Sequence, residues 1–520
     1  EFTLLLGAWL LLSRLRKSRL RVPFLALLAF VYLLALLYAI YENLSLSLYQ
    51  EDPLFYAQAQ LILEGLPFVL RHLSVAPAWI AAGALAILLA LGGIFALLRL
   101  VTAEGSTAAL GVLSKTVLTA LVFFILASFL FNGRALASPK SVVSCLTCKI
   151  GRNIDGSIAS AARVHNMQQI PLDQVYDYGD YALLARPDIY LIFIESYGGM
   201  LYRRQLREPY MELLEEVEQE LAGEGWHAST ILSESPSWGG GSWMAYTSAL
   251  FGLRLDTHPA YLALMQRFAD GSYPHLGNTL QEMGYEHARV TSIAVELDEE
   301  KWQQYRTFYG TDRWLRHRDL AYDGRHYGWG PAPPDQFVLN AANQELQKSG
   351  RPLFLFLITQ NSHYPWQELP PLAAEWQTLN DGSEPNPKPQ LTTPKVKVKP
   401  DDYMASIRYE LRFLTRFIRE EADDDAIFIL VGDHQPGYIT RPEDGLETPL
   451  HILSKDETLV SSFYEYGFVP GLSLENPEAG MKHEGLYSLL MRALLQRYGR
   501  GDRLPPPYLP HGAADINVSD

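Results

Sequence analysis

Cysteine is nearly absent from this chain, which has 2 cysteines among 520 residues. A disulfide-built scaffold is therefore excluded, and the fold must rest on hydrophobic packing. An excess of basic residues is also missing, because 58 acidic side chains against 43 basic ones give a net charge of −15. Nucleic-acid-binding proteins usually carry a basic surface, so nucleic acid is not an expected partner. The length predicts two or more domains.

Charged residues are scarce at the start of the chain, where residues 1–140 hold 10 basic and 6 acidic side chains among long apolar runs. Three runs are long enough to cross a bilayer, namely Val22–Tyr41, Pro77–Leu98 and Leu110–Phe131. The basic cluster Arg14–Arg21 precedes the first of them, and the positive-inside rule puts such a cluster in the cytoplasm. Three crossings from there place the acidic remainder of the chain outside the cytoplasmic membrane.

A shorter apolar run, Phe2–Leu12, opens the chain and indicates a first helix that is clipped, or one that follows a missing helix. We therefore expect about four spans in a transmembrane helical domain at residues 1–133. A polar linker at 134–186 and a catalytic domain at 187–520 follow. Within the linker, Cys145 and Cys148 predict a local disulfide, with a redox pair or half of a zinc site as alternatives.

Continuous apolar runs of strand length recur in the acidic part of the chain. The runs within Pro187–Gly199, Pro352–Trp366 and Ala426–Pro436 are rich in β-branched and aromatic residues, as in strands buried on both faces. Helix-like stretches separate them, over Leu201–Ala222 and Tyr403–Glu420. Strands that alternate with helices predict a doubly wound, mostly parallel α/β sheet.

Polar side chains stand at the ends of these predicted strands. Glu195 ends the first, His363 follows the second, and Asp433 and His434 end the third. In doubly wound sheets the ligand binds beyond the carboxyl ends of the strands, so we expect these side chains to converge. Carboxylate oxygens with an imidazole nitrogen are ligands for a divalent metal such as zinc or manganese.

The stretch "SPSWGGGSWMAYTSALFGL" delivers a serine, Ser242, from three consecutive glycines into a predicted helix. Glycines are typical of tight turns and of places where a ligand approaches the main chain. A plain loop with an N-cap serine is the alternative. If Ser242 joins the metal ligands, the metal lowers the pKa of its hydroxyl and makes it a nucleophile, and the glycines leave room for a phosphate or sulfate.

Four motifs, "YLIFIESYGG", "GGGSWMAYTSALFGL", "ITQNSHYPW" and "FILVGDHQP", stand in the order and spacing of the alkaline phosphatase/sulfatase superfamily. Within it the chain resembles the membrane-anchored transferases, which include lipoteichoic acid synthase and the phosphoglycerol and phosphoethanolamine transferases. The resemblance covers about 187–497. It implies five transmembrane helices followed by an extracytoplasmic catalytic domain.

The resemblance also implies roles for particular residues. Ser242, where the family has threonine, is the implied nucleophile. The implied metal ligands are Glu195, Ser242, Asp433 and His434. The implied substrate-binding residues are His363, His483, Trp302 and Arg306. Trp302 and Arg306 lie in "EEKWQQYRTFYGTDRW", where the lipoteichoic acid synthases keep residues that bind the head group. His483, in "KHEGLYSLL", is matched through its short motif alone.

The implied reaction is metal-dependent transfer of a phospholipid head group, phosphoglycerol first, to a glycan or polymer hydroxyl through a covalent Ser242 intermediate. The alternatives are a phosphoethanolamine transferase and a sulfatase-like hydrolase or phosphodiesterase. "SESPS" lacks the arginine that formylglycine sulfatases need, and no cysteine follows Cys148, unlike the disulfide-rich lipid A branch. The implied cofactor is one divalent metal: manganese, with zinc or magnesium as alternatives. The implied location is a bacterial cytoplasmic membrane, crossed several times, with the catalytic domain in the periplasm.

Overall fold

The fold is described from a computed structural model. It describes residues 19–49, 52–72, 77–101, 116, 120, 123, 146–269, 273–295, 297–328, 330–366, 368–383, 399–501 and 503–515. The predicted run Phe2–Leu12 and Cys145 lie outside these ranges, as does nearly all of the predicted span Leu110–Phe131. The chain divides into two compact units, the first of which holds Glu1–Leu46, Asp52–Ala59 and Ser74–Ala161 and the second the remainder.

The first unit contains two helices that are long and apolar enough to cross a membrane, judged by length and composition. These segments, Arg21–Leu46 and Ala81–Leu100, coincide with two of the predicted runs. They lie in α2 (Arg21–Tyr49) and α4 (Pro77–Val101). Three side chains at the contact between the two helices are nearly fully buried: Leu25, Ala29 and Leu98.

The segment predicted as a linker is partly helical. It contains α6 (Leu146–Met167) and the short α7 (Leu172–Val175), and α3 (Phe55–His72) precedes it in the chain. In the first unit the Lys149 ammonium pairs with the Glu42 carboxylate at 2.5 Å, and Asn153 Oδ1 accepts a hydrogen bond from the Phe55 backbone N–H. These contacts attach α6 to α2 and to the start of α3 within the first unit.

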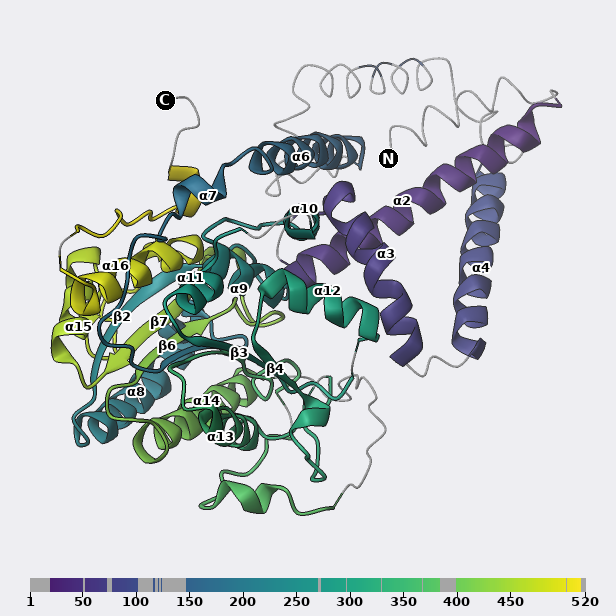
Figure 1. The fold of residues 1–520 in the computed structure, drawn as a ribbon. Coiled ribbons are helices and arrows are strands. Elements are labelled where there is room, and N and C mark those ends of the chain that lie inside the picture. Colours follow the sequence, from purple (N-terminus) through teal and green to yellow (C-terminus); the bar gives the residue numbers. More distant parts are fainter. Residues whose placement is uncertain are drawn as a thin grey trace. The chain divides into compact units, whose positions relative to one another are not determined.

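The second unit is built on one mixed sheet with the strand order β4-β3-β5-β1-β6-β7-β2-β8, and β9 pairs with β2 (Figure 1). The strands β4, β3, β5, β1 and β6 are mutually parallel, whereas β7 runs antiparallel to both β6 and β2. The strands are β1 Ile189–Ile194, β2 His227–Glu234, β3 Glu286–Thr291, β4 Arg313–Arg316, β5 Leu353–Ile358, β6 Ile427–Gly432, β7 Glu447–Ser454, β8 Val469–Pro470 and β9 Ala479–Lys482. The predicted doubly wound, mostly parallel sheet is confirmed.

Helices cover both faces of this sheet, as a doubly wound fold requires (Figure 1). On one face lie α8 (Arg207–Ala222), α13 (Asp335–Leu346) and α14 (Pro400–Glu420). On the other lie α9 Ser242–Phe251, α10 His258–Ala269, α11 Leu276–Glu282, α12 Glu299–Tyr309, α15 Glu457–Ser462 and α16 Leu486–Tyr498. The predicted helix Leu201–Ala222 is confirmed only from Arg207 onward, because residues 199–206 form two short 3-10 turns.

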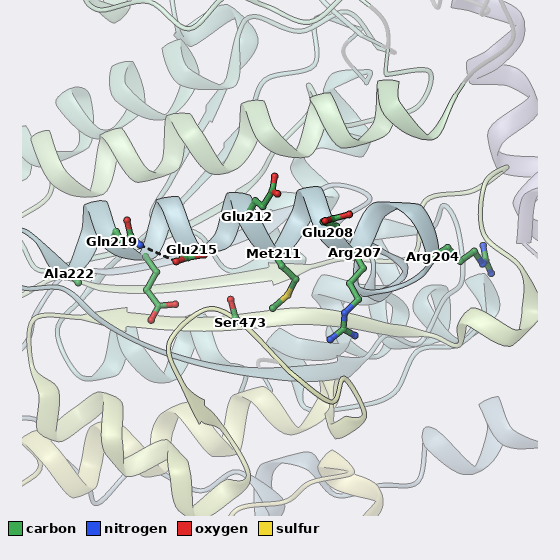
Figure 2. Close-up of a pocket in the computed structure, with 10 residues that line it drawn as sticks. Arg204, Arg207, Glu208, Met211, Glu212, Glu215, Gln219, Ala222 and Ser473 are labelled. Carbon is green, nitrogen blue, oxygen red and sulfur yellow. Dashed lines mark hydrogen bonds between the residues drawn. The ribbon is translucent and has the colours of Figure 1, made fainter.

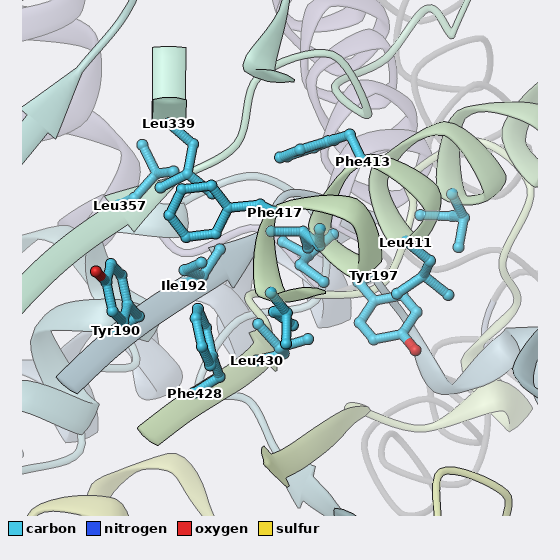
Figure 3. Close-up of a cluster of buried hydrophobic side chains, with 14 of the residues drawn as sticks. Tyr190, Ile192, Tyr197, Leu339, Leu357, Leu411, Phe413, Phe417, Phe428 and Leu430 are labelled. Atoms are coloured by element: carbon cyan, nitrogen blue, oxygen red, sulfur yellow. The ribbon is translucent and has the colours of Figure 1, made fainter. Parts of the chain in front are cut away.

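The hydrophobic core between the sheet and α14 explains the apolar sequences of the central strands and of one face of α14. Strands β1 and β6 are buried on both faces, which accounts for their uninterrupted apolar sequences. On α14, Tyr403, Ile407, Leu411, Leu414 and Ile418 recur at helical spacing and are buried. Figure 3 shows members of this cluster, with Phe417 of α14 close to Tyr190 and Phe428 of the sheet. Each such side chain contributes about 1.5–3 kcal/mol by leaving water.

Candidate metal centre

Two neighbouring parallel strands bring the first acidic residues together. Ile194, the last residue of β1, pairs with Gly432, the last residue of β6, so Glu195 and Asp433 leave the sheet side by side. A Cβ atom on Gly432 would lie 1.9 Å from the Tyr197 carbonyl oxygen. Glycine at this position is therefore required for the close approach of the two loops that follow the strands.

The glycine run before Ser242 adopts the left-handed backbone that glycine alone takes without strain. Gly240 has φ 73° and Gly241 has φ 79°, and Gly241 is the N-cap of α9. Ser242 is the first residue of that helix, and no side chain caps the helix N-terminus. The serine hydroxyl thus stands beside backbone N–H groups at the positive end of the helix dipole, where an anion is stabilised.

Glu195, Asp433 and His434 form a buried cluster whose candidate ligand atoms all lie within 4.8 Å of one another. His434 Nε2 is 3.4 Å from Glu195 Oε1 and 3.4 Å from Asp433 Oδ2. Ser242 Oγ donates a hydrogen bond to Glu195 Oε2 at 3.0 Å and lies 3.4 Å from His434 Nε2. The structure therefore brings together all four residues that the sequence predicts as metal ligands.

Hydrogen bonds from the surrounding main chain fix the orientation of this cluster. Asp433 Oδ1 accepts from the backbone N–H groups of Ser196 and His434, each at 2.7 Å. His434 Nδ1–H donates to the Gln435 carbonyl at 2.8 Å, which leaves Nε2 as the unprotonated nitrogen. Nε2 accepts from the Gly240 N–H at 3.0 Å and faces the carboxylates, which is the tautomer a metal ligand needs.

The cluster has the electrostatics of a cation site. Asp433 Oδ2 is buried and has no hydrogen-bond partner within the described part of the chain. Burial, together with the Glu195 carboxylate, raises the pKa of Asp433 to about 7. Burial lowers the pKa of His434, but Asp433 and Glu195 outweigh it and raise that pKa above its ordinary value. The two buried carboxylates repel each other because water does not screen their charges. Together with the neighbouring imidazole and hydroxyl, they are a suitable ligand set for a divalent metal.

Thr359 belongs to the support of this cluster and was not singled out by the sequence. Its Oγ1 accepts a hydrogen bond from the Glu195 backbone N–H at 3.1 Å, and it lies 3.3 Å from Ser362 Oγ. It therefore ties the loop after β5 to the loop after β1. The available signal was its position as the first polar residue after the apolar run of β5.

His363 is placed near the cluster by that same loop. Its Nδ1–H donates to the Tyr364 carbonyl at 2.6 Å, so Nε2 is the basic nitrogen. Burial lowers the pKa of His363, and this effect outweighs the hydrogen bond to the Tyr364 carbonyl, which acts to raise it. His363 is consequently neutral at pH 7 and suited to accept a proton.

His483 is buried and uses both ring nitrogens within the protein. Nε2–H donates to the Gly432 carbonyl at 3.0 Å, and Nδ1 accepts from Ser233 Oγ at 2.8 Å. Burial lowers the pKa of His483 to about 3, so the ring is neutral. These bonds join β9 and the following turn to the ends of β6 and β2. The substrate-binding role predicted for His483 stays a prediction, with the ring nitrogens engaged elsewhere in this structure.

We expect His483→Ala to destabilise the second unit by about 2–4 kcal/mol, because two buried hydrogen bonds and packed volume are lost. Urea unfolding measures the change. His451→Ala is the matched control, since His451 is equally buried and bonds Tyr197 and Thr230 through its two nitrogens. Similar losses in both variants would fit a structural role. A raised KM for substrate in His483→Ala alone would contradict it.

Trp302 and Arg306 lie on α12 and make no hydrogen bond, ion pair or ring contact with the cluster in the described residues. The Trp302 ring packs on Trp314 at 4.5 Å between centroids, and the Arg316 guanidinium lies 4.7 Å above it. Arg306 is exposed on the same helix. The substrate-binding role predicted for these two residues therefore stays a prediction.

A groove of about 780 Å³ lies along α8, and the residues of the Glu195–Asp433–His434 cluster do not line it (Figure 2). Its walls carry several charged side chains, with Arg207, Glu212 and Ser473 among the residues shown. None of its lining residues is a predicted site residue. The groove lacks histidine and does not share the chemistry of the cluster.

Part of the chain matches the model of a known protein family. A model of the family described as Sulfatase matches residues 254–463, which include His363, Asp433 and His434. The chain resembles the alkaline phosphatase/sulfatase superfamily. This sulfatase-like segment confirms the resemblance predicted from the four motifs. No curated protein matches the chain.

Several solved structures are similar to this sulfatase-like protein. The lipoteichoic acid synthase LtaP from Listeria monocytogenes is 15% identical, with TM-score 0.40 over 64% of this chain and 78% of that one. The phosphoglycerol transferase GacH from Streptococcus pyogenes, in complex with sn-glycerol-1-phosphate, is 16% identical, with TM-score 0.33 over 69% and 89%. The soluble domain of lipooligosaccharide phosphoethanolamine transferase A from Neisseria meningitidis is 12% identical, with TM-score 0.40 over 64% and 96%. These similarities are too distant to transfer a substrate or a mechanism.

Proposed function

We propose that this protein is a metal-dependent phosphotransferase. It moves the head group of a membrane phospholipid, with phosphoglycerol as the first candidate, to a hydroxyl of a glycan or polymer. The observation that carries this proposal is the position of Ser242 Oγ, 3.0 Å from Glu195 Oε2 and 3.4 Å from His434 Nε2, at the N-terminus of a helix. A hydroxyl held among metal ligands beside free N–H groups is suited to attack phosphorus.

The proposed reaction has two steps. Ser242 Oγ gives up its proton and attacks the donor phosphorus, the bond from phosphorus to the diacylglycerol oxygen breaks, and that oxygen takes up a proton. The head group remains on Ser242 as a phosphodiester. An acceptor hydroxyl then attacks, the Ser242 oxygen leaves and regains a proton, and the head group passes to the acceptor. Two such half-reactions predict ping-pong kinetics.

The residues have distinct proposed roles in these steps. Glu195, Ser242, Asp433 and His434 would hold a divalent cation, which would supply positive charge to the phosphate oxygens and lower the pKa of the Ser242 hydroxyl. Manganese is the first candidate, with zinc or magnesium as alternatives, because all three accept oxygen ligands. The N-terminal N–H groups of α9 receive the phosphate oxygens. His363, neutral with Nε2 as its basic nitrogen, takes the proton of the acceptor hydroxyl.

The domain organisation and location belong to the same proposal. Residues 1–133 would form the membrane domain, 134–186 the connection and 187–520 the catalytic domain, outside a bacterial cytoplasmic membrane. Two apolar helices in the first unit support a membrane anchor. An anchor holds the site near the lipid surface, where a phospholipid donor is found. The remaining span count follows from the sequence alone.

The direct test is intact-protein mass spectrometry after an acid quench. The full chain, purified in detergent with Mn²⁺, is mixed in turn with phosphatidylglycerol and phosphatidylethanolamine. We expect a mass increment equal to one head group in the wild-type chain and no increment in Ser242→Ala. The donor that gives the increment identifies the head group. The absence of an increment with both lipids, in protein shown to hold the metal, would refute the proposal and favour a hydrolase.

A further inference from the structure

Arg289, on β3, is a buried cation without an acidic partner in the part of the chain that the structure describes. Its side chain is about 97% buried, since the residue is 3% exposed. Nε and Nη1 have no hydrogen-bond partner among the described residues. A buried guanidinium is costly unless its charge is compensated, so the surroundings must stabilise it in another way.

Four aromatic rings surround this guanidinium, and we call them the Arg289 cage. The guanidinium carbon lies 4.0 Å from the ring centroid of Tyr309, 4.1 Å from that of Phe356, 4.6 Å from that of Tyr246 and 4.9 Å from that of Trp314. Cation–π attraction at these distances compensates a desolvated charge. The rings come from α9, α12, β4 and β5, so Arg289 joins four elements through one side chain.

The cage is connected to the helix that begins with Ser242. Tyr246 lies four residues after Ser242 and therefore on the same face of α9, one turn along. The hydroxyl of Tyr309 is 2.7 Å from Thr247 Oγ1, which attaches the next residue of α9 to the same cage. Two consecutive residues in the first turns of α9 are thus held by groups that pack on Arg289.

The cage also reaches β1, the strand that leads to the predicted metal ligand Glu195. Tyr246 contacts Phe193 edge-on, at 6.2 Å between centroids. Phe193 is the last residue but one of β1, and Glu195 follows the end of that strand directly. The Arg289 cage accordingly contains a ring of α9, the helix that begins with Ser242, and through that ring contacts the end of β1, the strand before Glu195.

On the N-terminal side of Ser242, the Gly240 N–H donates a hydrogen bond to His434 Nε2 at 3.0 Å, and no aromatic cage is present there among the described residues. Gly239, Gly240 and Gly241 precede Ser242, and α9 has no side-chain cap. We infer that Arg289 is a positioning residue that sets the place of Ser242 Oγ through Tyr246, Tyr309 and Thr247. The inference rests on the proposed function, because it assumes that Ser242 is the nucleophile. Arg289 itself touches neither the metal ligands nor a reacting atom.

The test uses the purified full chain with Mn²⁺ and bis(p-nitrophenyl) phosphate, a soluble phosphodiester that reports the attack step alone. We expect Arg289→Met to lower kcat about 10- to 100-fold while KM stays within about twofold, since the position of the nucleophile changes and the proposed substrate-binding groups do not. Arg289→Lys keeps the charge in the cage and should recover part of kcat. Tyr309→Phe removes only the hydroxyl that meets Thr247, and should lower kcat several-fold without a loss of folding.

Arg267→Met is the matched control. Arg267 lies on α10 with its guanidinium carbon 4.6 Å from the Tyr273 centroid, and it has no contact with the first turns of α9 among the described residues. We expect wild-type kcat in this variant. If Arg289→Met and Tyr309→Phe keep wild-type kcat while Ser242→Ala is inactive, the inference is overturned and the proposed function stands. If Ser242→Ala keeps wild-type kcat, the proposed function fails and the inference falls with it.

A double-mutant cycle with Tyr246→Leu gives a readout that general destabilisation does not move. If Arg289 acts through Tyr246, the loss of kcat in Arg289→Met with Tyr246→Leu should be close to that of the more impaired single variant. Multiplicative losses would overturn the inference, because they mean that the two side chains act independently. If Arg289→Met fails to fold, the cycle is completed with Arg289→Lys.

Discussion

Ser242→Ala should lower kcat for head-group transfer by about a thousandfold or more, because the proposed reaction has no other nucleophile. The hydroxyl that is removed is the one 3.0 Å from Glu195 Oε2. Transfer is measured with the phospholipid that gives the covalent adduct and a soluble glycan acceptor. KM has no simple expectation in this variant, since the residual reaction would follow another route.

Ser242→Thr is the informative companion, because threonine keeps a hydroxyl at the start of α9. We expect it to retain activity and to form the covalent adduct. The thermal midpoint and bound Mn²⁺ are recorded for both variants, so that inactivity is not confused with an unfolded chain. Activity in Ser242→Ala near the wild-type value would contradict covalent catalysis and leave direct attack by the acceptor or water.

The central sheet was predictable because its strands are buried on both faces. "IYLIFI", "LFLFLI" and "IFILVG" are uninterrupted apolar sequences, and they became β1, β5 and β6. The residues that end these strands, Glu195 and Asp433, then follow from the rule that ligands gather at the carboxyl edge. The four predicted ligands converge for this reason, from positions separated by as many as 239 residues.

Other strands could not be predicted from the sequence. β3 reads "EHARVT" and β4 "RWLR", whose charged residues argue against burial in a single-sequence analysis. Arg289 is tolerated in β3 because aromatic rings from four other elements surround its guanidinium. Periodicity along one segment carries no information on such contacts. The antiparallel β7 likewise depends on its pairing with β2 and β6.

The hydrogen bonds of His483 are a further example of contacts that a sequence does not predict. The family resemblance implies that His483 binds substrate, and in this structure Ser233 and Gly432 hydrogen-bond to its two ring nitrogens. Both partners are more than fifty residues away in the chain. A sequence therefore predicts which residue types can perform the chemistry, and tertiary contacts decide which nitrogen is available for it.

Removal of the metal should destabilise the second unit, and the loss should be greater at pH 7.5 than at pH 5. In the metal-free protein the pKa of Asp433 is raised to about 7 by burial and Glu195, whereas an unfolded aspartate has a pKa near 4. The folded state therefore binds more protons than the unfolded state between these values, and stability falls as the pH rises. The pKa of His434 is also raised, so its contribution has the same sign and is lost above pH 6.5.

A bound cation reverses this dependence because it requires deprotonated ligands. The measurement is the thermal midpoint with EDTA and with Mn²⁺ at pH 5, 6 and 7.5. At a metal concentration of 100 times Kd, linkage gives about 2.7 kcal/mol of stabilisation. The buried histidines His287 and His451, whose pKa burial lowers to about 3, act in the opposite direction. They contribute equally with and without metal, so the difference between the two midpoints isolates the cluster.

Asp433→Asn is the matched variant, since asparagine keeps the size of the side chain and removes its charge. We expect its midpoint to respond weakly to Mn²⁺ at every pH, because a ligand charge is missing and the repulsion with Glu195 is relieved in the metal-free state. In the absence of metal this variant should be more stable than the wild-type chain at pH 7.5. A wild-type midpoint that shifts by the same amount at pH 5 and pH 7.5, or an equal shift in Asp433→Asn, would exclude these ligands as the metal site.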